Sequence, residues 1–283
     1  MTDRARLLIS TEDLAARLGD PNLVVVDASW YLPAMERDAA AEFAVAHIPG
    51  AVRFDIDAIA DTSVPLPHML ASAETFAAAV GALGISETSD IVVYDGAGLF
   101  SAPRVWWNLV VYGAKSVRLL DGGLPKWIAE GRPMETGAPK PPTLKTFAVR
   151  IDTGRIADLD AVVGVLADGS ATVVDARPGE RFRGEAAEPR PGVRSGHMPG
   201  ARNVPFAAVV AEGRLADEAA IRAAFADVDL DRPIVTSCGS GVSAAILWLA
   251  LEAAGVPRGQ LALYDGSWSE WGASPATTVA TGA

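Results

Sequence analysis

The single cysteine of the chain, Cys238, stands in a segment whose residue types favour nucleophilic chemistry. It follows the apolar run 233–237 and is followed by Gly239, Ser240, Gly241 and then an apolar stretch typical of a helix. Two glycines permit a tight turn whose N–H groups point inward, and the positive end of a helix dipole adds to their effect. Such a loop favours the thiolate, which is the nucleophilic form of cysteine. The alternative is a buried structural cysteine, since cysteine is among the most buried residue types.

The neighbouring residues exclude several other kinds of cysteine chemistry. A phosphatase or arsenate-reductase loop needs an arginine six positions after the cysteine to clamp a dianion, and Ala244 stands there instead. One cysteine cannot form an intramolecular disulfide or a cysteine-rich zinc site. It also leaves no internal thiol to resolve a sulfur adduct, so an outside acceptor must remove the sulfur. We therefore predict no metal site.

An internal repeat organises the elements that must position this loop. Four segments of the first half recur in order in the second half, namely 23–28 at 171–176, 47–51 at 197–201, 91–96 at 234–239 and 121–127 at 265–271. The repeat predicts an N-terminal domain over 1–138, a linker over 139–149 and a C-terminal domain over 150–283. Asp95 takes the place of Cys238 in the first copy, so only the second copy carries the nucleophile.

Short β-branched runs separated by helical stretches predict an α/β fold. The expected buried strands are 23–26, 91–94, 117–120, 172–174, 234–237 and 261–264, and helices are expected at 72–83 and 219–226. This alternation predicts parallel sheets with helices on both faces, and ligands then bind at the carboxyl ends of the strands. The uncharged run 233–251 resembles a membrane span, but its hydroxyl residues and glycines favour a buried strand, loop and helix.

Composition limits the classes of partner. The chain has 35 acidic and 24 basic residues, a net charge of -11, and 50% hydrophobic residues, which are ample for packed cores. The sign of the charge argues against a nucleic-acid or anionic-membrane partner. The apolar stretch near the N-terminus meets Glu12 and Asp13 too early for a signal peptide, so we expect a cytoplasmic protein.

Three groups of motifs together identify a family resemblance. They are the loop Cys238-Gly239-Ser240-Gly241-Val242-Ser243-Ala244, the paired His-x-Pro-Gly-Ala segments, and Asp265-Gly266-Ser267-Trp268. Over nearly its whole length the chain resembles the tandem rhodanese sulfurtransferases, which implies two rhodanese-like domains with a catalytic second domain. The neutral loop is similar to that of the 3-mercaptopyruvate branch, whereas thiosulfate enzymes usually carry basic residues after the cysteine. Ser243 replaces a threonine of that pattern and keeps the hydroxyl group.

The resemblance also implies where substrate binds. Arg181 and Arg190 fall on the two carboxylate-binding arginines of the family, and a planar guanidinium binds a carboxylate through two parallel hydrogen bonds. The loop residues Gly239, Gly241, Val242 and Ser243 are expected to cradle the sulfur. The alternative for these arginines is surface charge paired with Glu180, Glu185 or Glu188.

Proton chemistry is implied for a further set of residues. Asp57 and His68 lie in segments that resemble those reaching the active site in the family, and with Ser240 they match a proton relay. The alternative for His68 is an ordinary surface histidine beside a proline. His47 and His197 both lie in the repeated Pro-Gly turn, so we interpret them as structural.

The implied reaction moves sulfur from 3-mercaptopyruvate through a Cys238 persulfide to cyanide or a thiol such as thioredoxin, releasing pyruvate. The family places this site in the cleft between the domains, and it requires no metal or organic cofactor because the cysteine carries the sulfur. Two alternatives stay open at this point. Thiosulfate could be the donor, or the protein could relay persulfide to a protein partner without catalysis.

Overall fold

The computed structural model describes residues 3–282 and divides into two compact units. The N-terminal unit comprises the described residues up to Asp61, Leu70–Asp152 and Glu212–Leu215. The C-terminal unit comprises Thr62–Met69, Thr153–Ala211 and the described residues from Ala216 onward. Two short segments therefore belong to the unit opposite to their neighbours in sequence. The limits 1–138 and 150–283 drawn from the repeat stay a prediction.

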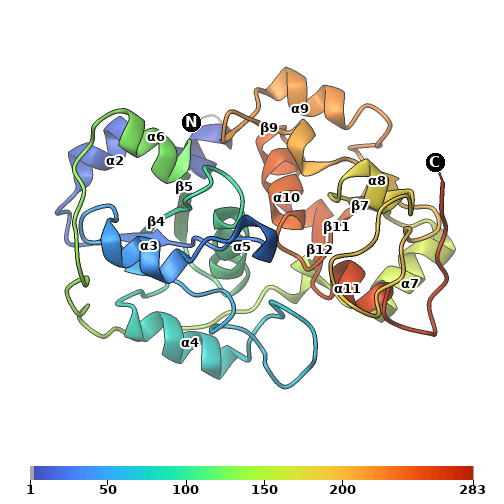
Figure 1. Cartoon of the computed structure of the whole chain (residues 1–283), viewed down its shortest axis with the longest axis horizontal. Coiled ribbons are helices and arrows are strands. Elements are labelled where there is room, and N and C mark those ends of the chain that lie inside the picture. Colours follow the sequence, from blue (N-terminus) through green and yellow to red (C-terminus); the bar gives the residue numbers. More distant parts are fainter. Residues whose placement is uncertain (1–2, 283) are drawn as a thin grey trace. The chain divides into compact units, whose positions relative to one another are not determined.

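The N-terminal unit is built on a five-stranded parallel sheet (Figure 1). In spatial order its strands are β1 (Leu8–Ile9), β5 (Ser116–Leu120), β4 (Asp90–Tyr94), β2 (Leu23–Asp27) and β3 (Val52–Arg53). The central strands are buried and rich in valine, because both faces of the sheet are covered.

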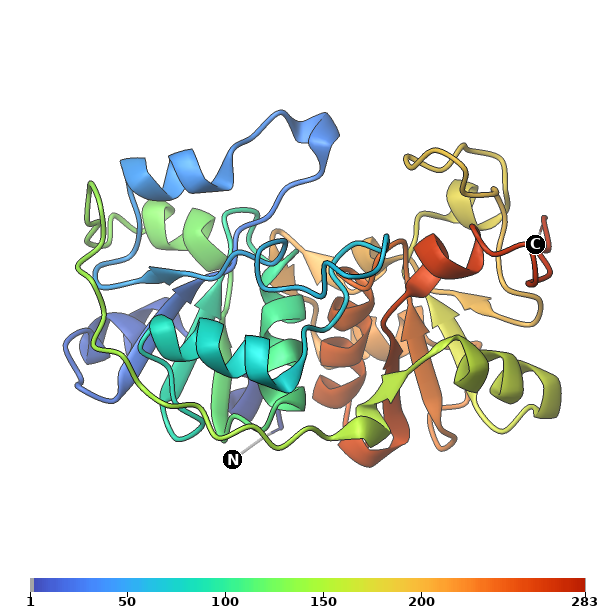
Figure 2. The same ribbon diagram turned by 90° about the horizontal axis from the view of Figure 1, so that it is seen from below.

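Helices cover both faces of this sheet (Figure 2). Leu14, Phe43 and Trp127 pack against one face, from α2 (Thr11–Arg17), α3 (Ala39–Val45) and α6 (Gly123–Ala129). On the other, α5 (Ala102–Val111) packs against β4 and β5, and α4 (Ala73–Ala82) stacks Phe76 on Tyr112 at the end of α5. A short helix, α1 (Asp3–Leu7), leads into β1.

The C-terminal unit repeats this architecture with the same order of strands. They are β6 (Ile156–Ala157), β12 (Leu261–Tyr264), β11 (Ile234–Ser237), β7 (Thr172–Asp175) and β8 (Arg202–Asn203), all parallel. Val162, Trp268 and Trp271 pack on one face from α7 (Leu159–Asp168) and α11 (Ser267–Trp271). The other face is covered by α10 (Ala244–Ala253), which also contacts α9 (Glu218–Ala224). The other short elements of the chain include α8 (Gly179–Phe182), the paired strands β9 (Val210–Ala211) and β10 (Arg214–Leu215), and four turns of 3-10 helix at Pro33–Met35, Thr153–Arg155, Phe206–Ala208 and Arg258–Gln260.

The fold class predicted from the alternation of apolar runs is confirmed, and so are the six predicted strands. The helix predicted from residue 72 is α4, and Ser72 caps it by accepting the N–H of Thr75 in the first turn. The uncharged run 233–251 forms β11, a loop and the buried helix α10, as predicted. No helix among residues 3–282 is long and apolar enough to cross a membrane.

The proline-rich segment predicted as a linker lies along the N-terminal unit. Residues 140–150 form neither helix nor strand. The N–H of Lys145 donates to the carbonyl of Gly81 at 3.0 Å, and that of Arg150 donates to the carbonyl of Tyr112 at 2.9 Å. Ala148 donates in the same way to the Glu87 carboxylate at 3.0 Å. These bonds fix the segment against α4 and α5.

Candidate active site

Cys238 lies where the central strand of the C-terminal unit ends. It directly follows β11 and is separated from α10 by a five-residue loop, at the edge of the sheet where all strands present their carboxyl ends. The residue is 2% exposed. Gly241 has a φ of 80°, a left-handed conformation that favours glycine and turns the loop toward the helix. Position and loop chemistry together make Cys238 the candidate nucleophile.

The start of α11 holds the backbone of this loop. The N–H of Cys238 donates to the Ser267 hydroxyl at 3.2 Å, and its carbonyl accepts from the N–H of Trp268 at 2.9 Å. The carbonyl of Gly239 accepts from both the N–H and the hydroxyl of Ser269, at 2.8 and 2.5 Å. Three successive peptide groups at the nucleophile are therefore fixed by one short helix.

Arg181 lies beside the loop, as a substrate-binding role requires. A Cβ placed on Gly239 would lie 3.2 Å from Nη2 of Arg181, so the guanidinium faces the peptide next to the nucleophile. Arg181 also donates from Nε and Nη2 to the Glu188 carboxylate, at 3.1 and 2.5 Å. Arg181 is therefore ion-paired with Glu188, as the surface-charge interpretation expects, and its substrate-binding role stays a prediction.

Behind Arg181 lies a buried charge network that the sequence did not indicate. Arg177, whose side chain is 1% exposed, pairs with Asp175 at 2.7 Å and with Glu188 at 2.9 Å. Its guanidinium also lies 4.2 Å from the ring centroid of Trp268. Burial by itself would lower the pKa of Arg177, but the adjacent Asp175 and Glu188 carboxylates outweigh that effect and raise it. Glu188 thus joins two arginines and connects the sheet to the edge of the cysteine loop.

The equivalent loop of the N-terminal unit contains its own anion. Asp95 is fully buried, and its carboxylate accepts N–H bonds from Ala97 at 2.9 Å and from Phe100 and Ala102 at 2.8 Å. The N–H groups of the loop and of the first turn of α5 therefore converge on one negative group. The carbonyl of Asp95 accepts from the N–H of Leu124 at 3.0 Å, which is the counterpart of the bond from Trp268 to Cys238.

The other predicted residues fall in different parts of the chain. Ser240 and Val242 belong to the same loop as Cys238 and are buried, with 7% and 3% of their surface exposed. Ser243 directly precedes the first residue of α10. His68 is buried and belongs to the segment Thr62–Met69 of the C-terminal unit.

Asp57 and Arg190 lie outside regular elements. Asp57 belongs to the N-terminal unit, where its carboxylate accepts the indole N–H of Trp30 at 2.9 Å. Arg190 is partly exposed in the loop after α8. Their predicted roles stay predictions.

The two histidines of the repeated turn are structural in geometry. Nδ1 of His47 lies 2.7 Å from the carbonyl of Phe43, and Nδ1 of His197 lies 2.8 Å from that of Phe182. The imidazole of His47 also stacks on the Phe43 ring, and that of His197 on the Phe182 ring, with ring centroids 4.2 and 3.9 Å apart. The rings therefore hold the turns in place in both units.

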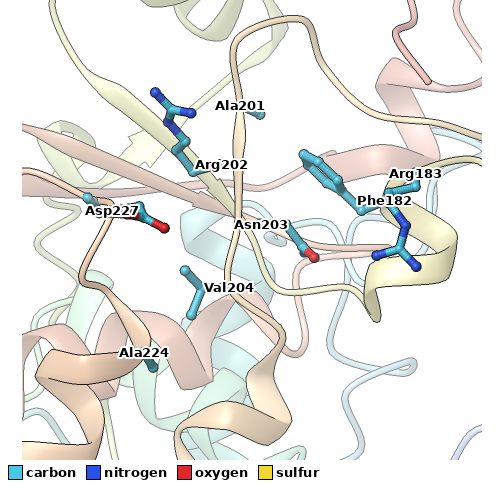
Figure 3. A pocket seen from close by; sticks show the side chains of 9 residues that line it. Phe182, Arg183, Ala201, Arg202, Asn203, Val204, Ala224 and Asp227 are labelled. Carbon is cyan, nitrogen blue, oxygen red and sulfur yellow. The ribbon is translucent and has the colours of Figure 1, made fainter. Parts of the chain in front are cut away.

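A pocket of about 480 Å³ in the C-terminal unit lies apart from this chemistry. Figure 3 shows its lining, which includes Arg183, Arg202, Asn203 and Asp227 and none of the predicted site residues. Arg183 pairs with Glu185 at 2.6 Å, and both side chains are partly exposed.

Sequence reasoning missed Ser267, Ser269, Arg177 and the bridging role of Glu188. The Asp-Gly-x motif repeated at 121–123 and 265–267 contains Ser267, but neither its residue type nor its spacing indicates a contact with the cysteine loop. Arg177 stands two residues after Asp175, the last residue of β7, but this spacing alone did not indicate that the two side chains form a buried ion pair.

The fold and the site define a protein of two α/β units with the same strand order. One unit carries a cysteine loop, and beside that loop lies an arginine of the type that binds carboxylates. A family model for the rhodanese-like domain matches residues 10–130 and again 159–274, so the chain belongs to the rhodanese family.

Several relatives match over nearly the whole chain. The chain is 43% identical to the 3-mercaptopyruvate sulfurtransferase of Escherichia coli (strain K12), covering 94% of each sequence. It is 42% identical to the human protein of the same name, covering 91% of this chain and 87% of the human one. It is 40% identical to a mitochondrial thiosulfate/3-mercaptopyruvate sulfurtransferase of Arabidopsis thaliana, covering 95% of this chain and 76% of the other.

Solved structures agree with these relatives. SseA from Escherichia coli, described with the 3-mercaptopyruvate sulfotransferases, matches with a TM-score of 0.85 and 39% identity over 92% of this chain and 98% of that one. Tum1 from Saccharomyces cerevisiae matches with a TM-score of 0.88 and 32% identity over 97% and 98% of the two chains.

Proposed function

We propose that this protein transfers sulfur from 3-mercaptopyruvate, through a persulfide on Cys238, to a thiol or cyanide acceptor. The observation that carries this proposal is the neutral loop after Cys238 with the Arg181 guanidinium facing Gly239. A keto acid thiol presents a carboxylate that an arginine can bind and a sulfur that a thiolate can attack. The relatives named for this reaction support the same donor.

The chemical step balances without an added oxidant or reductant. The Cys238 thiolate attacks the substrate sulfur, a sulfur–sulfur bond forms and the carbon–sulfur bond breaks. The electron pair passes to the substrate carbon as the enolate of pyruvate, and the proton from the substrate thiol ends on that carbon. The products are pyruvate and a Cys238 persulfide, which an incoming thiol or cyanide returns to the thiolate.

The loop supplies electrostatic stabilisation in this proposal. N–H groups of Gly239, Gly241, Val242 and Ser243 would surround the outer sulfur, in the way that the N-terminal loop surrounds the Asp95 carboxylate. Preorganised donors of this kind stabilise an anionic sulfur because they need no reorganisation during the reaction. Arg181 and Arg190 would bind the substrate carboxylate.

Ser240 and His68 are the proposed path for the proton. Both are buried and both belong to the C-terminal unit. Histidine can exchange a proton near neutral pH, and a hydroxyl can pass it on or donate to the enolate oxygen. Asp57 is proposed as the third member of the set.

The proposal extends to acceptor and location. With a single cysteine in the chain, the sulfur must leave to an outside acceptor, and a reduced protein dithiol such as thioredoxin would serve. We propose a cytoplasmic protein without a metal or organic cofactor, with no nucleic-acid or membrane partner.

Thiosulfate is the second candidate donor, because the Arabidopsis relative carries both substrates in its name. A steady-state assay of one preparation with each donor, and cyanide as acceptor, separates the two. We expect kcat/KM to favour 3-mercaptopyruvate by about a hundredfold or more, equivalent to roughly 2.7 kcal/mol of transition-state binding. A preference for thiosulfate would overturn the assignment of donor, and turnover of neither would favour the persulfide relay.

A further inference from the structure

Ser267 adopts an uncommon backbone conformation in a fully buried position. It is the first residue of α11, with a φ of 48° and no exposed surface. A positive φ is strained for a residue with a Cβ atom, because that atom approaches the backbone. Glycine avoids this strain, so the retention of serine needs a reason that involves its side chain.

The hydroxyl of Ser267 holds the nucleophile. It accepts the N–H of Cys238 at 3.2 Å and donates to the carbonyl of Tyr264, the last residue of β12, at 2.8 Å. The next residue, Trp268, donates its N–H to the carbonyl of Cys238. Both backbone polar groups of Cys238 are therefore bound by consecutive residues of α11, which fixes the direction of its Cα–Cβ bond.

The N-terminal unit offers an internal comparison at the same position. Gly123 begins α6 as Ser267 begins α11, and its φ of 55° is nearly the same. Leu124 still donates its N–H to the carbonyl of Asp95. The carbonyl half of the clamp is thus common to both units, whereas the hydroxyl half exists only where the loop carries a cysteine.

We propose that Ser267 is a positioning residue, retained despite its backbone strain because its hydroxyl aims the Cys238 sulfur into the loop. The inference rests on the proposed function to the extent that Cys238 is the sulfur carrier. Ser267 acts indirectly, through the peptide N–H of Cys238. A group that aims the nucleophile alters reactivity even when the fold is unaffected, since misplacement of a reacting atom by about 1 Å can cost on the order of a hundredfold in rate.

The test is Ser267→Gly, the residue that the N-terminal unit itself uses. Removal of the strain stabilises this variant, whereas loss of the hydroxyl leaves the buried N–H of Cys238 and carbonyl of Tyr264 without that partner. The two effects are of similar size and opposite sign, so we expect a small change in melting temperature. We expect kcat with 3-mercaptopyruvate to fall by at least about tenfold with a smaller change in KM. Alkylation of the resting enzyme by iodoacetamide reports on Cys238 alone, because the chain has no other cysteine, and its rate constant should fall because the sulfur is no longer held in one direction.

Two further variants complete the test. Ser267→Ala keeps the strain and loses the hydroxyl, so it should match Ser267→Gly in reactivity while being less stable. Glu36→Gly is the matched control, because Glu36 is an exposed residue with a φ of 50° and should change neither alkylation nor turnover.

Each outcome decides the proposal. Wild-type alkylation and turnover in Ser267→Gly would overturn it, whatever the stability of that variant. A wild-type enzyme that does not use 3-mercaptopyruvate would refute the proposed function. The alkylation rates of the wild type and the variants would still test the role of Ser267.

Discussion

The guanidinium of Arg181 serves two carboxylates in this account. Glu188 occupies Nε and one N–H of Nη2, which fixes the plane of the group beside Gly239. The remaining N–H groups are on the other edge and can bind a substrate carboxylate. Ion pairing and ligand binding are therefore compatible, and Glu188 orders the arginine before substrate arrives.

Replacing Arg190 by alanine distinguishes an enzyme from a persulfide relay. A lost charge-assisted hydrogen bond to the substrate carboxylate costs about 1.5–3 kcal/mol, so kcat/KM for the keto acid should fall roughly tenfold to a hundredfold, mainly through KM. Steady-state kinetics with 3-mercaptopyruvate measures this.

Arg183→Ala is the matched control, since this arginine on the same segment pairs with the exposed Glu185. It should leave both constants unchanged. Unaltered KM in Arg190→Ala would remove the carboxylate role and favour the relay.

At the scale of single residues, motifs predicted the loop but not the residues that brace it. Cys238 and the two glycines are recognisable because their types are unusual and adjacent in sequence. Ser267 is an ordinary turn residue in sequence, and only its φ and its bond to Cys238 give it a role. Arg177 pairs with Glu188, and this contact forms only when the loop after α8 folds back.

At the scale of elements, the two strand-to-helix loops are alternative solutions to one problem. In each, N–H groups at a strand end and the start of a helix must be satisfied away from water. The N-terminal loop uses the Asp95 carboxylate for this purpose and leaves no room for a ligand there. The C-terminal loop has a smaller thiol at that place, and in the proposed function its N–H groups bind the added sulfur.

Asp95→Ala should therefore destabilise the protein strongly. Three N–H groups lose a charged acceptor in a buried place, and we expect a loss of about 3 kcal/mol in the free energy of unfolding. Urea denaturation followed by circular dichroism measures it. Asp38→Ala is the control, because this exposed residue caps α3 through the N–H groups of Ala40 and Ala41 and should cost only about 1 kcal/mol. Equal losses in the two variants would contradict the buried-anion account.

The apolar runs predicted the long strands and the helices α4, α9 and α10, but neither the buried helix α5 nor the short strands. β1, β3, β6 and β8 have two residues each, too few to give a recognisable run. Their pairing comes from neighbouring strands rather than from their own sequence. For α9 the first helical residue is Glu218, one position before the predicted start, because Asp217 caps it.

At the scale of the whole molecule, the repeat was the strongest predictor of architecture. Both units have the same strand order, as expected for two copies of one domain. The assignment of Thr62–Met69 and Glu212–Leu215 to the opposite units depends on tertiary contacts, which local sequence patterns do not reveal. For His68, in the first of these segments, the family resemblance alone implied a place at the active site, and its assignment to the C-terminal unit comes from the structure.

The central claim is that Cys238 itself carries the sulfur, and intact-protein mass spectrometry tests it most directly. After incubation with 3-mercaptopyruvate and no acceptor, the wild-type chain should gain the mass of one sulfur atom and lose it again on addition of cyanide. Cys238→Ser, which has no cysteine left, should gain nothing. A sulfur adduct on Cys238→Ser, or turnover by the wild type with no adduct on Cys238, would contradict the account.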